Sequence, residues 1–161
     1  MNLASFAPQW LALVFAFLLV AAAIEDAVRL RISNIIVVLV LLGAVVTAFI
    51  LGIELRMWQN VALLVAALAI GTPLFGRGIL GGGDVKLMAA TFAWFNLSAA
   101  PNLLLAIALA GGVLALLVIA LRSLNWSEKA RQRAVVLQRR GGIPYGVAIA
   151  AGALISMALQ R

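Results

Sequence analysis

The sequence predicts an all-α polytopic membrane protein, a single domain over residues 1–161 with about six transmembrane helices. Hydrophobic residues make up 66% of the chain and charged residues only 11%, whereas a soluble domain is about half apolar and about a quarter charged. Uncharged apolar runs follow one another along the chain, and a crossing helix needs about 20 residues. These observations exclude a soluble enzyme and a soluble binding module.

The first three apolar runs cover residues 7–24, 35–53 and 58–75. Glu25 and Asp26 end the first run, and Thr72-Pro73 is expected to kink or end the third. The first run has a possible cleavage site for a signal peptidase at Ala21-Ala22-Ala23. A secretory signal needs positive charge near its start, and residues 1–10 contain no Lys or Arg. We therefore expect a retained first helix.

A glycine-rich connection over residues 76–83 leads into a short fourth run, residues 85–97, whose only charge is Lys86. Because a crossing helix needs about 20 residues, we expect the fourth helix to begin at the glycines and to extend toward Pro101. Asp84 would then lie slightly inside the apolar zone. The fifth run covers residues 103–121 and the last covers residues 143–159, with a long polar loop over residues 122–142 between them.

The basic residues predict the orientation. If the first helix ends in the cytoplasm, only Arg56 and Arg161 of the twelve Lys and Arg residues fall outside, and ten fall in cytoplasmic segments. Basic residues collect in cytoplasmic loops, so both termini are expected outside. Topology and contact with anionic membrane lipids then explain the net charge of +7, and no nucleic-acid partner is expected. The basic loop receives no catalytic role.

The residues available for chemistry are few. The chain has no cysteine and no histidine, which excludes disulfides, thiol nucleophiles, Ser-His-Asp triads and zinc sites built on those residues. Its two aspartates, Asp26 and Asp84, both fall at the predicted cytoplasmic boundary. A carboxylate at membrane depth is costly and indicates a function. The alternative is an ion pair with a neighbouring base, namely Arg29, Arg31 or Lys86.

Three glycines, Gly81, Gly82 and Gly83, directly precede Asp84. They leave the backbone bare and able to take unusual dihedral angles, so an extended peptide could approach the carboxylate and pair with main-chain groups. The alternative is a flexible loop without chemistry. Two nearby carboxyl groups suggest aspartic-protease chemistry, since like charges close together cannot both ionise. The ionised carboxylate would activate water, and the protonated one would polarise the peptide carbonyl. This chemistry needs no metal and no cofactor.

Two motifs resemble those of the type IV prepilin peptidases. Residues 81–86 read G-G-G-D-V-K, which is similar to the family signature G-x-G-D-x-K. Asp26, followed by Arg31-Ile32-Ser33-Asn34, resembles the family's aspartate ahead of R-I-P-N, with serine in place of proline. Pro144-Tyr145-Gly146 also resembles a family segment. The resemblance covers essentially the whole chain, and it implies that Asp26 and Asp84 are the catalytic pair of a membrane aspartic endopeptidase.

The resemblance also implies the substrate and the location. The expected reaction is removal of the short basic leader from prepilins and pseudopilins at the cytoplasmic face of the bacterial inner membrane. Long members of the family carry a cysteine-rich cytosolic domain and also methylate the trimmed pilin. This chain has no cysteine and resembles the short forms that serve Flp-type (Tad) pili, so N-methyltransferase activity is not expected.

Three residues have possible supporting roles. Asn34 could orient the first aspartate or touch substrate, but with Ser33 it also forms a good N-cap for the second helix, which is the preferred interpretation. Lys86 could tune the second aspartate, but it more naturally reaches lipid headgroups. Pro144 could shape the start of the last helix near the site, or simply begin that helix. Gly111, Gly112, Gly146 and Gly152 are expected only to let helices approach closely.

A proton- or ion-coupled transporter is the rival interpretation, because intramembrane carboxylates can bind and release cations. A transporter would favour ionisable groups near the bilayer midplane and symmetric halves with broken helices. Here both aspartates fall at one membrane face and the chain shows no internal repeat, which favours the peptidase. The sequence does not predict an oligomeric state.

Overall fold

The computed structural model describes residues 1–124, 126 and 142–160, and every regular element in this part is a helix. The all-helical class is therefore confirmed for these residues. The elements are α1 (Leu3–Phe6), α2 (Gln9–Arg29), α3 (Asn34–Leu51), the 3-10 helix η1 (Leu55–Met57), α4 (Trp58–Gly76), α5 (Gly82–Phe92), α6 (Ala100–Ser123) and α8 (Tyr145–Leu159). Most of the predicted polar loop over residues 122–142 lies outside the described residues.

Four helical segments of the described part are long and apolar enough to cross a membrane. They are α2, α3, η1 together with α4, and α6. Helix α8 is also apolar but has only 15 residues. These lengths are consistent with a multi-pass membrane protein, and the count of six crossings stays a prediction.

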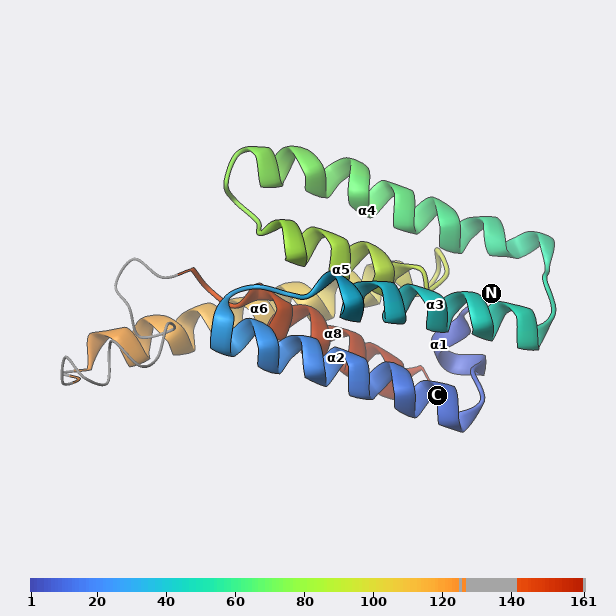
Figure 1. The fold of residues 1–161 in the computed structure, drawn as a ribbon, viewed down its shortest axis with the longest axis horizontal. Helices are drawn as coiled ribbons and strands as arrows, with labels where there is room; N and C mark the ends of the chain where they lie inside the picture. The colour runs from blue at the N-terminus through green and yellow to red at the C-terminus, as the bar shows by residue number, and fades with distance from the viewer. Residues whose placement is uncertain (125, 127–141, 161) are drawn as a thin grey trace.

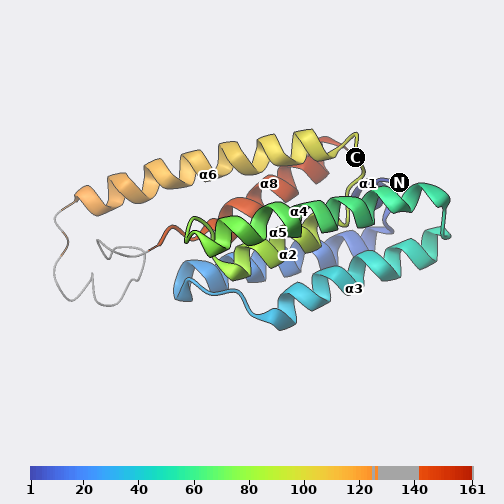
Figure 2. The same ribbon diagram turned by 90° about the horizontal axis from the view of Figure 1, so that it is seen from above.

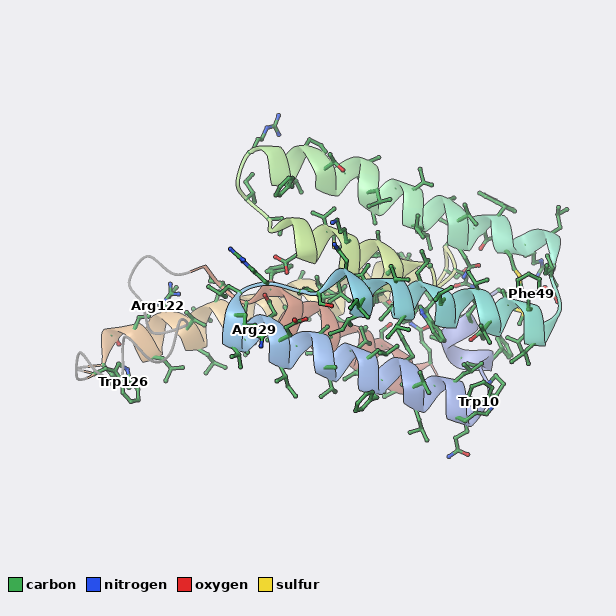
Figure 3. All side chains as sticks on the ribbon, viewed as in Figure 1. Trp10, Arg29, Phe49, Arg122 and Trp126 are labelled. Atoms are coloured by element: carbon green, nitrogen blue, oxygen red, sulfur yellow. The ribbon has the colours of Figure 1, made fainter. Side chains whose placement is uncertain are left out.

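The helices run up and down along one common direction (Figure 1). The α2–α3 and α4–α5 connections and the start of α8 gather at one end, whereas the two termini lie at the other end in both views (Figures 1 and 2). Asn2 Nδ2 donates a hydrogen bond to Gln160 Oε1 at 2.6 Å and so joins the terminal segments. Figure 3 shows Arg29 and Arg122 at the first end, which we call the basic end, and Trp10 and Phe49 at the opposite end.

Helix α5 lies in the middle of the bundle, where it packs on α3, α4 and α8 (Figure 2). It has 11 residues and is therefore about 16 Å long, much shorter than the roughly 30 Å hydrocarbon core of a membrane. The expectation of a helix of about 20 residues from the glycines to Pro101 is wrong. Its neighbours cover its backbone, so the chain can leave the helix at Phe92 without exposing peptide groups to lipid.

The turn that follows α5 is held by protein groups. Trp94 stacks on Phe15 with ring centroids 4.1 Å apart, and its Nε1 donates to the carbonyl of Val40 at 2.9 Å. The carbonyls of residues 93 and 95 accept from Asn60 Nδ2 at 3.0 and 2.9 Å. The carbonyl of Trp94 accepts from the N–H of Ala4 at 3.0 Å, in the short helix α1. These tertiary bonds replace the helical bonds that α5 would otherwise make, so the helix ends early.

Helix α4 does not end at Thr72-Pro73 but continues to Gly76. Pro73 has no N–H to donate to the helical ladder. Thr72 Oγ1 turns back and donates to the carbonyl of Leu68 at 2.7 Å, a local bond that polar side chains inside helices often make. The glycine-rich connection is thus shorter than its sequence suggests, because its first glycine still belongs to α4.

Helices α6 and α8 approach each other closely at Gly152, where a small residue was expected to allow this. A Cβ at this position would lie 2.5 Å from the backbone nitrogen of Ile107, which cannot move aside as a side chain can. We expect Gly152→Ala to lower the free energy of unfolding by about 1–3 kcal/mol, the usual cost of an overpacked interior. Thermal or denaturant unfolding in detergent micelles measures this change.

Gly112→Ala on α6 is the matched control, because a Cβ there would meet nothing within 4 Å. Its stability should equal that of the unmodified chain or exceed it by up to about 1 kcal/mol, the helix-propensity difference between Gly and Ala. Equal stability of the Gly152 and Gly112 variants would contradict the close α6–α8 packing.

Candidate active site

Asp26 and Asp84 line the same cavity at the basic end of the bundle. The cavity has a volume of about 240 Å³, and its walls are residues 30–32 of the α2–α3 turn and residues 81–83 at the start of α5. The two carboxyl groups are close enough for their charges to repel each other. The structure thus brings together the two aspartates that the sequence singles out. No cluster of three or more His, Cys, Asp or Glu side chains suited to a metal ion occurs among the described residues.

Asp26 lies in the last turn of α2, because the helix continues past it to Arg29. Its side chain is buried, at 4% exposure, and its Oδ2 accepts the N–H of Gly146 at 2.7 Å. Arg29 pairs instead with Glu25, at 3.8 Å, since these two residues are one helical turn apart. Within the described part of the chain, Asp26 therefore makes none of the ion pairs that were its alternative explanation.

Asp84 lies in the first turn of α5, and its Oδ2 accepts the N–H of Gly81 at 3.2 Å. The first amides of a helix lack partners within the helix and favour a negative group nearby. Lys86 does not pair with Asp84. Its Nζ donates to Asn34 Oδ1 at 3.0 Å, so Lys86 joins α5 to the start of α3 instead.

The glycine run before Asp84 provides space and not unusual dihedral angles. None of residues 81–83 has positive φ, so the unusual dihedral angles that glycine allows are not adopted here. A Cβ at Gly81 would lie 2.8 Å from Asp84 Oδ2, one at Gly82 3.3 Å from the Phe75 ring, and one at Gly83 3.2 Å from Ile32 Cβ. The absent side chains allow the carboxyl group and the α2–α3 turn to approach the backbone closely.

The α2–α3 turn has a left-handed residue directly after the helix that carries Asp26. Leu30 has φ 52° and ψ 37°, and it is the one non-glycine residue with positive φ in the described ranges. This conformation costs a side-chain-bearing residue about 1–2 kcal/mol. The N–H of Leu30 still donates to the carbonyl of Asp26 at 2.8 Å. The left-handed residue ends α2 and directs the next two residues along the cavity.

Two residues of the site, Gly146 and Ile32, received no role in it from the sequence, although both lie in segments that resemble family motifs. Gly146 was expected only to aid helix packing, yet its amide donates to Asp26 and also faces Asp84. Ile32 is buried and packs between Gly83 and Gly146, because a Cβ on either glycine would lie within 3.2 Å of its side chain. The Pro144-Tyr145-Gly146 segment is the signal that could have located Gly146, since a proline that begins a helix leaves the next amides free of helical partners.

The structure gives different contacts to the residues for which supporting roles were considered. Ser33 Oγ accepts the amides of Ile35 and Ile36 at 3.1 and 3.4 Å, so the capping role that was expected of Ser33 and Asn34 together belongs to Ser33. Asn34 binds Lys86 instead. Pro144 is buried at the N-cap position of α8, two residues before Gly146. It therefore begins the helix whose first turn contacts Asp26.

A search of curated proteins and a search of solved structures found no match. The model of the type IV leader peptidase family matches residues 13–116, a range that extends from α2 into α6 and includes both aspartates of the cavity. This match spans well over half of the chain, and the chain therefore belongs to the type IV leader peptidase family.

Proposed function

We propose that the chain is an aspartic endopeptidase that removes the basic leader from Flp-type prepilins and pseudopilins, with Asp26 and Asp84 as the catalytic pair. The observation that carries the proposal is the shared cavity of the two carboxyl groups, on helices α2 and α5, inside the region that the family model matches. Family membership supports leader-peptidase activity in general. We further propose the catalytic residues, the class of pilin that is cleaved and the side of the membrane on which cleavage occurs.

The proposed reaction divides the work between the two carboxyl groups. Because they repel each other when both are charged, one is ionised and the other holds a proton. The ionised carboxylate takes a proton from water, and the water oxygen attacks the scissile carbonyl carbon. The protonated carboxyl group polarises the carbonyl oxygen. When the C–N bond breaks, the leaving nitrogen receives the proton that the carboxylate took from water, and the pair again holds one proton. The cavity of about 240 Å³ has room for water beside a peptide backbone.

The position of the site supports a substrate that is itself a membrane helix with a basic segment at its edge. The side of α2 away from the bundle exposes large apolar residues such as Leu13, Phe17 and Ile24, which suit lipid contact, and the same helix ends beside Asp26. A peptide bond at the end of a substrate's apolar helix would therefore lie level with the two carboxyl groups when that helix packs in the membrane beside α2. We place the basic end in the cytoplasm of a bacterial inner membrane, because basic residues collect on that side.

A cleavage assay in lipid vesicles tests the proposed function. The purified chain is reconstituted and incubated with a synthetic prepilin segment that includes the basic leader and the apolar helix. We expect one cut at the junction of the two parts, identified by mass spectrometry. A substrate that remains intact, together with proton or cation uptake by the same vesicles, would overturn the peptidase in favour of a transporter.

A further inference from the structure

Glu25 lies next to Asp26 on α2, and its carboxylate binds the far end of the α2–α3 turn. Its Oε2 accepts the backbone N–H of Ser33 at 2.8 Å, and its side chain is only 22% exposed. A hydrogen bond from a backbone amide to a charged acceptor is stronger than one between neutral groups. Glu25 thus ties the turn back onto the helix that carries Asp26.

The turn that Glu25 holds fills the space between the two aspartate segments. The side chain of Ile32 packs against Gly83, the residue before Asp84, and against Gly146, whose amide binds Asp26. A Cβ on Gly83 would lie 3.2 Å from Ile32 Cβ, and a Cβ on Gly146 would lie 2.8 Å from Ile32 Cδ1. Close-packed interiors transmit displacements of this kind. A shift of the turn would therefore move both aspartate segments.

The same turn is tied to α5 on its other side. Lys86 Nζ donates to Asn34 Oδ1 at 3.0 Å, which connects the first turn of α3 to the helix that carries Asp84. Glu25 thus binds the α2–α3 turn to the helix of Asp26, and Lys86 binds the residue directly after this turn to the helix of Asp84.

We propose that Glu25 is a positioning residue of the active site, which fixes the spacing of Asp26 and Asp84 by holding the amide of Ser33 and hence the side chain of Ile32. This inference rests on the proposed function of the two aspartates. In this proposal the positioning depends on the Glu25 oxygen that accepts the Ser33 amide, and not on the ion pair between Glu25 and Arg29. Arg29 lies 3.8 Å from Glu25 and its side chain is 72% exposed, and exposed ion pairs contribute little.

Three variants separate the acceptor from the charge. Glu25→Ala removes the acceptor, and we expect a decrease in kcat of about 10- to 100-fold with little change in KM, as for catalytic groups displaced by a fraction of an ångström to 1 Å. Glu25→Gln keeps an oxygen that can accept the Ser33 amide, and should rescue most of this loss. Arg29→Gln removes only the ion pair and should cleave like the unmodified chain. A Gln variant as slow as the Ala variant would overturn the proposal.

A spectroscopic measurement tests the same proposal without catalysis. The chain has no cysteine, so Arg31→Cys provides a single site for a nitroxide label in the turn. We expect greater label mobility in Glu25→Ala than in Glu25→Gln or in the labelled parent. An equally immobile label in Glu25→Ala, or an unchanged kcat, would overturn the positioning role. If the unmodified chain cleaves no prepilin, the proposed function itself fails, whatever the label shows.

Discussion

Asp26→Asn and Asp84→Asn are each expected to lower kcat for prepilin cleavage by about 10³-fold or more. General acid–base catalysis contributes about 10²- to 10⁴-fold, and in the proposed reaction the attack of water on the carbonyl carbon needs both carboxyl groups. An amide neither takes nor supplies the proton. It has almost the same shape, however, and its oxygen can still accept the Gly146 amide at position 26 or the Gly81 amide at position 84. Cleavage rates of the purified variants in vesicles measure the loss.

The same variants should fold at least as stably as the unmodified chain. Asparagine removes a carboxylate that is costly to bury and that its neighbour repels, so a lower melting temperature is not expected. The combined Asp26→Asn/Asp84→Asn variant should be about as slow as the slower single variant, because groups that act as a unit are not additive.

Glu54→Gln is the matched control for this pair. It makes the same acid-to-amide change at an exposed position in the connection between α3 and α4, at the end away from the cavity (Figure 1). We expect cleavage at the rate of the unmodified chain. Wild-type rates for either aspartate variant, or an equal loss in the Glu54 variant, would contradict the assignment of Asp26 and Asp84.

The two aspartates could be found from sequence because of where they occur. In a chain with so few charged groups, a carboxylate at the edge of an apolar run has a cost that needs a reason. The three glycines before Asp84 also indicate a close approach of some kind. Their common cavity could not be predicted from spacing alone. It depends on α5 packing on α3, α4 and α8, and apolar runs do not specify which helices are neighbours.

The length of α5 shows why the fold could be predicted only in outline. Residues 85–97 have the composition of a continuing helix, and intrinsic preference gives no reason to stop at Phe92. The helix stops because Trp94 and Asn60 make bonds to distant parts of the chain, and such tertiary bonds override local propensity. The role of the glycines before Asp84 also depends on tertiary contacts that the sequence does not show. Sequence alone does not show whether a glycine is needed for its dihedral angles or for its missing Cβ, and here it is the latter.

Gly146 was harder to find because its contribution is a backbone N–H, which every residue except proline has. Only its position distinguishes it: it lies in the first turn of α8, where amides lack helical partners, and beside Asp26. A Cβ at this glycine would lie 2.9 Å from Asp26 Oδ2 and 2.8 Å from Ile32 Cδ1. The packing role expected of Gly146 and its hydrogen bond to the aspartate both depend on the missing side chain.

Gly146→Ala is therefore expected to lower kcat by about 10- to 100-fold, the loss that follows when a catalytic group moves by up to about 1 Å. The tip of Ile32 can rotate away from the added methyl group, but Asp26 can move only by lengthening its 2.7 Å bond to the Gly146 amide. Gly142→Ala is the matched control, because a Cβ there would meet only Leu30 Cδ1, at 3.8 Å. It should cleave prepilin at the rate of the unmodified chain, and equal losses in the two variants would contradict the prediction.

Ile32→Val then separates the two clashes at Gly146, because valine lacks the Cδ1 atom that the new methyl group would meet. If the displaced Asp26 causes the loss, Gly146→Ala stays slow when combined with Ile32→Val. A combined variant that recovers the rate of Ile32→Val alone would show that the loss came from Ile32, and would overturn the role given to the Gly146 amide. Every variant keeps the backbone N–H of residue 146. The comparison therefore tests whether the position of the Asp26 carboxyl group matters for cleavage, and it does not test the loss of the hydrogen-bond donor.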